Sequence, residues 1–155
     1  MGKSIILWLP VLWYPLCFIH EFGHYISAKI NGSPDAKIVW HYGFLSETER
    51  SGSSNPIIDI ISAPLMVIGV LGLIWLISIV IKFKERLFGF FFGYGLLMNG
   101  VYFCLGSIDG EYTDSGQLIG LGINKITIMV ISSLIAVVGL YLIGRFSNQS
   151  LKGSA

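Results

Sequence analysis

Three residues that could bind a metal and act on water lie within one short stretch, CFIHEFGHYIS at residues 17–27. His20 and His24 are four residues apart, so on a helix both imidazoles lie on one face and can reach the same ion. Zn²⁺ suits imidazole ligands, and a catalytic zinc site keeps one position for water. Glu21 is placed to take a proton from that water and pass it on. The pattern predicts one Zn²⁺ per chain, with His20 and His24 as ligands and Glu21 as the catalytic group.

The surroundings of this stretch favour the metal over a structural role. The chain has three histidines in all, and two of them have ligand spacing. The stretch lies in an apolar run, where an ionisable group at membrane depth costs up to about 3 kcal/mol. A bound zinc contributes on the order of 10 kcal/mol, which offsets that cost. The remaining histidine, His41, could be an oxyanion donor or a further ligand, but we expect it to be a surface residue on a strand.

The composition indicates which elements must position these residues. Of the 155 residues, 54% are hydrophobic and 12% are charged, against about 25% charged in soluble domains. The apolar residues form long blocks, as in an integral membrane protein. The net charge of +1 provides no basic surface for nucleic acid. Cys17 and Cys104 form neither a CxxC pair nor a disulfide framework.

Four apolar stretches are long enough to cross a membrane as helices, at residues 4–30, 57–81, 87–105 and 126–143. Between the first two, AKIVWHYGFL is rich in β-branched and aromatic residues, which indicates a short strand or hairpin, or else an irregular amphipathic loop. The sequence therefore predicts an all-α polytopic membrane protein with about four transmembrane helices and a short β-strand or hairpin between the first two. We expect residues 1–155 to form a single domain, and the protein to be an integral, multi-pass protein of the cell membrane.

Proline and glycine residues indicate local features of the first three of these helices. Pro15 should kink the first helix or mark the start of its regular part. Gly89 and Gly93 have the spacing of small residues on a close-packing face of a transmembrane helix. Gly69 and Gly72 suggest a similar face in the second helix.

A catalytic zinc needs a third protein ligand besides the two histidines. With four helices, the first and third connecting loops lie on the same side, which is also the side nearest to HEFGH. The third loop carries Asp109, Glu111 and Asp114. Asp59 lies on that side too, but an Asp in the first turn of a helix is explained by the helix dipole. Counting helices thus directs the search for the third ligand to the acidic third loop.

HEFGH in a first transmembrane helix, with an Asp before a later helix, resembles the site-2 protease family of intramembrane zinc metalloproteases. SAPLMVIGVLG at residues 62–72 is similar to the small-Pro-Leu segment of that family. The family's third ligand is an Asp in a motif resembling D-G-G-R-hydrophobic at the start of a helix. We choose Asp114, in DSGQLIG, because it leads into an apolar helical stretch; Asp109, in IDGE, is the alternative. Asn99 could match the family's Asn, but no Pro follows it before Asp114, and a helix-packing hydrogen bond explains it more simply.

The resemblance implies hydrolysis of peptide bonds in membrane-embedded or membrane-proximal protein substrates. The partners would be the lipid bilayer and a membrane protein or transmembrane peptide, which must unwind to expose a peptide bond. Residues 37–44 could hold the unwound substrate by strand addition. The sequence leaves open whether the chain forms a homo-oligomer.

Functions from other classes are also to be considered. The main alternative is a non-catalytic zinc-binding membrane scaffold or adaptor that binds partner helices. Glu21 favours the enzyme, because it is not a ligand and a structural site has no need of it. A metal transporter would need acidic or histidine residues within the third and fourth helices, and these stretches contain none.

Overall fold

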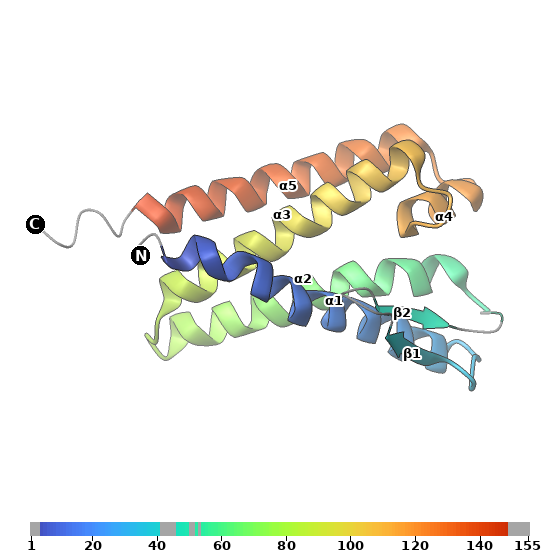
Figure 1. The fold of residues 1–155 in the computed structure, drawn as a ribbon, viewed down its shortest axis with the longest axis horizontal. Helices are drawn as coiled ribbons and strands as arrows, with labels where there is room; N and C mark the ends of the chain where they lie inside the picture. Colours follow the sequence, from blue (N-terminus) through green and yellow to red (C-terminus); the bar gives the residue numbers. More distant parts are fainter. Residues whose placement is uncertain (1–3, 41–45, 50–51, 53, 149–155) are drawn as a thin grey trace, which may run out of the picture. The chain divides into compact units, whose positions relative to one another are not determined.

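The protein folds into long helices with one small sheet. The computed structural model describes residues 4–40, 46–49, 52 and 54–148 (Figure 1). Their elements are, in chain order, α1 (Ser4–Ile30), β1 (Lys37–Trp40), β2 (Ser46–Glu49), α2 (Pro56–Val80), α3 (Glu85–Asp109), α4 (Asp114–Gly120) and α5 (Lys125–Asn148). The four long helices coincide with the four predicted stretches, and β1 pairs with β2 as an antiparallel hairpin between the first two helices. The predicted fold class is confirmed.

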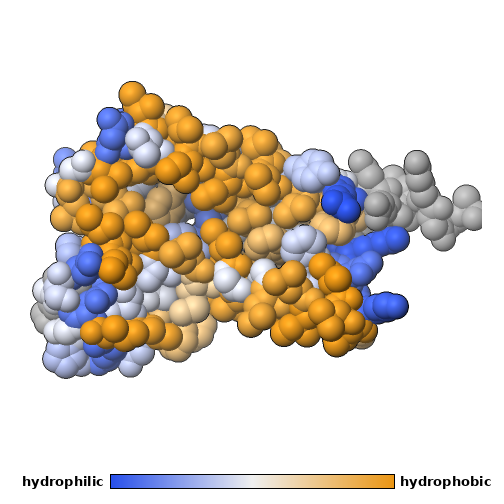
Figure 2. All heavy atoms as spheres, turned by 180° about the vertical axis from the view of Figure 1, so that it is seen from behind, coloured by the Kyte–Doolittle hydropathy of each residue, from blue (hydrophilic) through white to orange (hydrophobic). Residues whose placement is uncertain are grey.

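Three of the described helices, α2, α3 and α5, are long and apolar enough to cross a membrane. Large apolar side chains cover their outer faces; Leu65 on α2 is 59% exposed and Leu134 on α5 is 62% exposed. In the space-filling view hydrophobic side chains dominate the flanks of the helices, and hydrophilic ones gather towards helix ends (Figure 2). Helices that are hydrophobic around their whole circumference are typical of membrane spans.

The first of the four predicted spans corresponds to α1, which has 27 residues. At the helical rise per residue this length corresponds to about 40 Å, more than the roughly 30 Å of the hydrocarbon core. The helix runs through Pro10 and Pro15 without interruption. Pro15 therefore does not mark the start of the regular helix, so that alternative of the prediction was wrong.

Contacts divide the chain into two compact units, whose boundary falls within α2. Among the described residues, the first unit comprises residues 4–67, which contain α1, the hairpin and the first half of α2. The second comprises residues 68–148, which contain the rest of α2 with α3, α4 and α5. The prediction of a single domain over 1–155 stays a prediction.

In the second unit, α3 and α5 pack closely through glycines. A Cβ atom added to Gly89 would lie 2.5 Å from the ring of Phe146, and one added to Gly93 would lie 2.9 Å from the Cβ of Leu142. From the facing helix, a Cβ on Gly139 would lie 2.6 Å from the carbonyl oxygen of Gly93. A side chain at Gly93 or Gly139 would separate the two backbones, and one at Gly89 would displace the ring of Phe146, which confirms the predicted close-packing face at Gly89 and Gly93.

The second predicted glycine face is not found. A Cβ added to Gly69 would have no atom of the described residues within 4 Å, and one on Gly72 would make an ordinary contact of 3.4 Å with Phe92. The prediction for this pair was therefore wrong: Gly69 faces open space and Gly72 touches an aromatic ring at van der Waals distance.

Candidate metal centre

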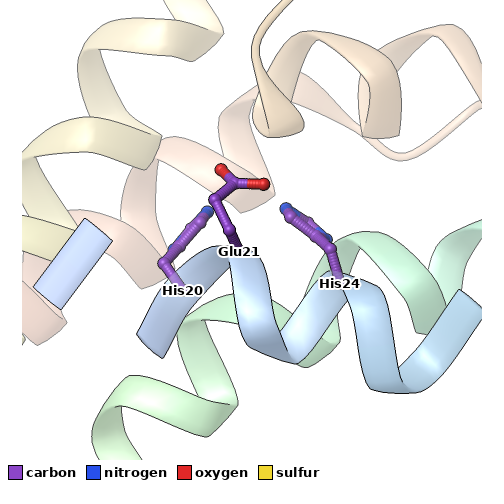
Figure 3. Close-up of side chains that lie close together, drawn as sticks. All are labelled: His20, Glu21 and His24. Carbon is purple, nitrogen blue, oxygen red and sulfur yellow. The ribbon is translucent and has the colours of Figure 1, made fainter. Parts of the chain in front are cut away.

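The helix α1 brings the three residues of the HEFGH motif together. The possible ligand atoms of His20, Glu21 and His24 all lie within 4.8 Å of one another. The two imidazole rings have their centroids 5.1 Å apart and stand nearly perpendicular to each other. Figure 3 shows both rings and the carboxylate projecting from the same side of the helix. The helical spacing of four residues accounts for this arrangement.

His24 is held in the form that a metal ligand requires. It is buried, and its Nδ1 lies 2.7 Å from the backbone carbonyl oxygen of Asp59 on α2. A carbonyl oxygen can only accept a hydrogen bond, so Nδ1 must carry the proton. In the neutral ring this leaves the lone pair on Nε2, the nitrogen available to an ion. A metal-bound histidine usually donates a hydrogen bond from its other ring nitrogen in this way. That bond fixes both the tautomer and the orientation of the ring.

The hydrogen bond to His24 depends on a close approach of α1 and α2 at Gly23. A Cβ added to Gly23 would lie 2.7 Å from the Cα of Ala63 and 2.8 Å from the carbonyl oxygen of Ser62. The hydroxyl of Ser62 lies 3.0 Å from the carbonyl oxygen of Gly23 and 2.7 Å from that of Asp59, and it can donate to either. Glycine between the two histidines, facing small residues of SAPLM, thus lets α2 lie directly against the motif.

The carboxylate of Asp59 ties the two helices together one turn further along α1. Its Oδ1 accepts hydrogen bonds from the hydroxyl of Ser27 and from the amide of Asn31, both at 2.6 Å. Asp59 is fully buried and lies in the first turn of α2, where the helix dipole also favours it. The dipole was the predicted explanation, and these bonds to α1 add a second one.

The hairpin presents one of its two faces to α1, and the register shows which residues this face carries. Ile38 pairs with Thr48, and Trp40 lies two residues beyond Ile38 on β1, so their side chains point to one face of the sheet. Lys37 and Glu49 point to the opposite face, where they form an exposed ion pair of 2.9 Å. The hydrogen bond and the charge of Glu49 raise the pKa of the Lys37 ammonium.

The inner face of the hairpin contacts α1 at two points. The ring of Trp40 stacks on Phe18, with centroids 5.8 Å apart and nearly parallel planes. The hydroxyl of Thr48 lies 2.8 Å from Oε2 of Glu21 and 3.0 Å from the backbone oxygen of the same residue. The carboxylate predicted to act on water is therefore hydrogen-bonded by a residue of β2.

Sequence reasoning did not single out Thr48, nor the backbone oxygen of Asp59. Thr48 lies in a polar stretch, SETE, without the alternation of apolar residues that indicates a strand. Only the pairing with Ile38, an inward-pointing residue of β1, could have suggested that Thr48 faces the helix. A backbone carbonyl leaves no signal in the sequence at all.

The two candidates for the third ligand both belong to the second unit, at different kinds of helix end. Asp114 is the first residue of α4 and is buried, whereas Asp109 is the last residue of α3. Thr113 caps α4 by accepting a hydrogen bond from the backbone N–H of Gly116 at 3.1 Å. A carboxylate is favoured at the N-terminal end of a helix and disfavoured at the C-terminal end. The helix dipole thus suits a carboxylate at the position of Asp114, and the choice of third ligand stays a prediction.

The remaining residues considered in the sequence have simpler environments. Asn99 is buried and donates to the carbonyl oxygen of Gly95, one turn earlier in its own helix, at 2.8 Å. The hydrogen bond is within α3 rather than between helices. Cys17 is a half-buried free thiol. His41 and Phe44 lie outside the residues that the structure describes.

Comparison of the chain with protein-family models, curated proteins and solved structures gives no match. Two imidazoles on one face of α1, one of them held by a backbone acceptor, are suitable ligands for Zn²⁺, and the carboxylate of Glu21 lies beside them, where it can act on water.

Proposed function

We propose that the protein is an intramembrane zinc metalloprotease that hydrolyses peptide bonds of membrane-embedded or membrane-proximal substrates. The observation that carries the proposal is the convergence of His20, Glu21 and His24, with the Nδ1 proton of His24 engaged by Asp59. In this proposal His20 and His24 hold the ion together with Asp114, for which Asp109 is the alternative. The resemblance of HEFGH to the site-2 protease motif supports the same reading.

In the proposed reaction the zinc ligands and Glu21 have separate roles. Bound to these ligands, Zn²⁺ would polarise the scissile carbonyl and increase the acidity of water. The carboxylate of Glu21 accepts the proton that a water molecule loses as its oxygen attacks the peptide carbon. Glu21 then returns this proton to the amide nitrogen as the carbon–nitrogen bond breaks, so that the products are a carboxylic acid and an amine.

The proposed substrate is a transmembrane segment of another protein in the cell membrane. The apolar surfaces of α2, α3 and α5 support a location in lipid. A transmembrane helix hides its peptide bonds in its own hydrogen bonds, so it must unwind before it is cut. The stretch 37–44, whose described part is β1, could pair with such an unwound segment by strand addition.

The test combines zinc content with cleavage in purified wild-type protein and in Glu21→Gln. We expect the wild type to contain one zinc per chain and to cleave a transmembrane peptide in detergent micelles or vesicles. Glu21→Gln should retain its zinc and lose cleavage by at least about a hundredfold, the lower range for loss of a general acid–base group. His20→Ala and His24→Ala should lose both zinc and cleavage.

Two outcomes would contradict the proposal in different ways. Wild-type protein without stoichiometric zinc would remove the metal site. Zinc that is retained in Glu21→Gln, together with unchanged behaviour in every assay, would favour the zinc-binding membrane scaffold or adaptor that binds partner helices.

A further inference from the structure

We propose that Thr48 is a positioning residue for Glu21, and that the hairpin thereby sets the orientation of the catalytic carboxylate. This inference rests on the proposed function and deepens it. Thr48 lies outside the HEFGH motif, on β2, and the structure defines the contacts of the hairpin with α1.

The geometry of the contact is specific. The hydroxyl oxygen of Thr48 lies 2.8 Å from Oε2 of Glu21 and 3.0 Å from the backbone oxygen of Glu21. A hydroxyl has one hydrogen and can donate to one acceptor at a time. The charged carboxylate is the stronger acceptor of the two. The backbone oxygen is the alternative acceptor of the same hydrogen.

Glu21 needs such a partner because of the freedom of its own side chain. A glutamate has three rotatable bonds, and fixing them costs conformational entropy. His24 is oriented by Asp59, but a carboxylate on the same helix receives no orientation from that bond. The hydroxyl of Thr48 supplies a fixed donor to one carboxylate oxygen and leaves the other oxygen for water. A misplacement of about 1 Å in a reacting group can cost a hundredfold in rate.

The hairpin can hold Thr48 in place because it is attached at a second point. Trp40 stacks on Phe18, two residues before the motif on α1. Trp40 and Thr48 lie on the same face of the hairpin. The stacked ring and the hydroxyl thus fix the sheet on α1 from two positions, and the carboxylate of Glu21 follows the position of the hairpin.

The experiment compares Thr48→Val, which keeps the shape and removes the hydroxyl, with Thr48→Ser, which keeps the hydroxyl. Glu49→Gln is the matched control, because Glu49 lies one residue away on the opposite face of the same strand. We expect Thr48→Val to lower kcat about ten- to a hundredfold with unchanged KM and zinc content. Thr48→Ser should recover most of the rate, and Glu49→Gln should behave like the wild type.

A second measurement does not depend on activity. Thermal unfolding of the full-length wild type, Thr48→Val, Glu21→Ala and the double variant forms a double-mutant cycle. Thr48→Val should lower the Tm of the protein that has Glu21 more than it lowers the Tm of Glu21→Ala.

The outcomes separate this inference from the proposed function. The wild type could cleave while Thr48→Val keeps an unchanged kcat, or while Thr48→Val and Thr48→Ser lose equally in kcat. Either result overturns the role of Thr48 and leaves the proposed protease function standing. Additive Tm changes in the cycle also overturn it, because they show that the two side chains do not interact. A wild type that cleaves nothing overturns the protease itself, whatever the cycle gives.

Discussion

At the scale of single residues, Gly23 is the position in the HEFGH motif at which the structure leaves no space for a side chain. His20 and His24 provide the nitrogen ligands for the proposed ion. His24 keeps its orientation only while α2 stays close enough for the carbonyl oxygen of Asp59 to accept its hydrogen bond. The space that a Cβ of Gly23 would occupy is already filled by the backbone of Ser62 and Ala63. The glycine is therefore explained by helix contact, independently of any chemistry at the metal.

Gly23→Ala should destabilise the protein and weaken zinc binding together. The added methyl group forces α1 and α2 apart, at a cost of about 1 to 3 kcal/mol. The matched control is Gly69→Ala, also within a helix, where a Cβ meets nothing within 4 Å and the change should leave stability unchanged or raise it by up to about 1 kcal/mol. Thermal unfolding and zinc content check both variants. Equal stability of the two would show that the close contact at Gly23 does not exist.

At the scale of elements, the pairing of α1 with α2 is held by polar groups. Asp59 uses its carboxylate for Ser27 and Asn31 and its backbone oxygen for His24. Polar contacts between helices are an established means of association in lipid, where the hydrophobic effect between helices is absent. The two functions of Asp59, the joining of the helices and the orientation of a ligand, can be separated because one belongs to the side chain and the other to the backbone.

Asp59→Ala should lower stability but retain zinc. The substitution leaves the two donors without their buried acceptor, at a cost of about 1 to 3 kcal/mol, whereas the backbone oxygen that accepts from His24 remains. Asp59→Asn keeps a side-chain oxygen in the same place and should lose less. Unfolding temperature and metal analysis of the purified variants give the answer. Loss of zinc with little change in stability would instead make Asp59 a ligand.

The elements also differ in how far the sequence predicts them. The long helices follow from apolar runs, because a chain in lipid must satisfy its backbone within each segment. Their ends are less certain: α3 and α5 extend into polar residues beyond the predicted 87–105 and 126–143. The seven-residue α4 has too few residues for a periodic pattern. It depends on its cap at Thr113 and on close contacts of Gly116 with the backbone of Gly110.

The same distinction applies to the candidate site. Local spacing on one helix predicts that His20, Glu21 and His24 converge, because the helical repeat alone brings them together. The partners that orient them come from other elements. Thr48 reaches Glu21 through the register of a hairpin, and Asp59 reaches His24 through the contact between two helices. Tertiary contacts of this kind cannot be predicted from spacing along the chain.

At the scale of the whole molecule, the proposed zinc links metal binding to the stability of the fold. A zinc ion that binds only the native state stabilises the folded chain by mass action. The identity of the third ligand then has a consequence for stability as well as for activity.

Zinc at about a hundred times its Kd should stabilise the wild type by about 2.7 kcal/mol, and removal by a chelator should lower the Tm accordingly. Asp114→Ala should contain less zinc after dialysis, gain less stability from added zinc, and lose cleavage. Asp109→Ala is the matched control, because it removes the other aspartate of the same connection and should keep all three properties. The reverse pattern would assign the third ligand to Asp109. A response to zinc that both variants share with the wild type would show that the ion takes its third ligand from elsewhere in the chain.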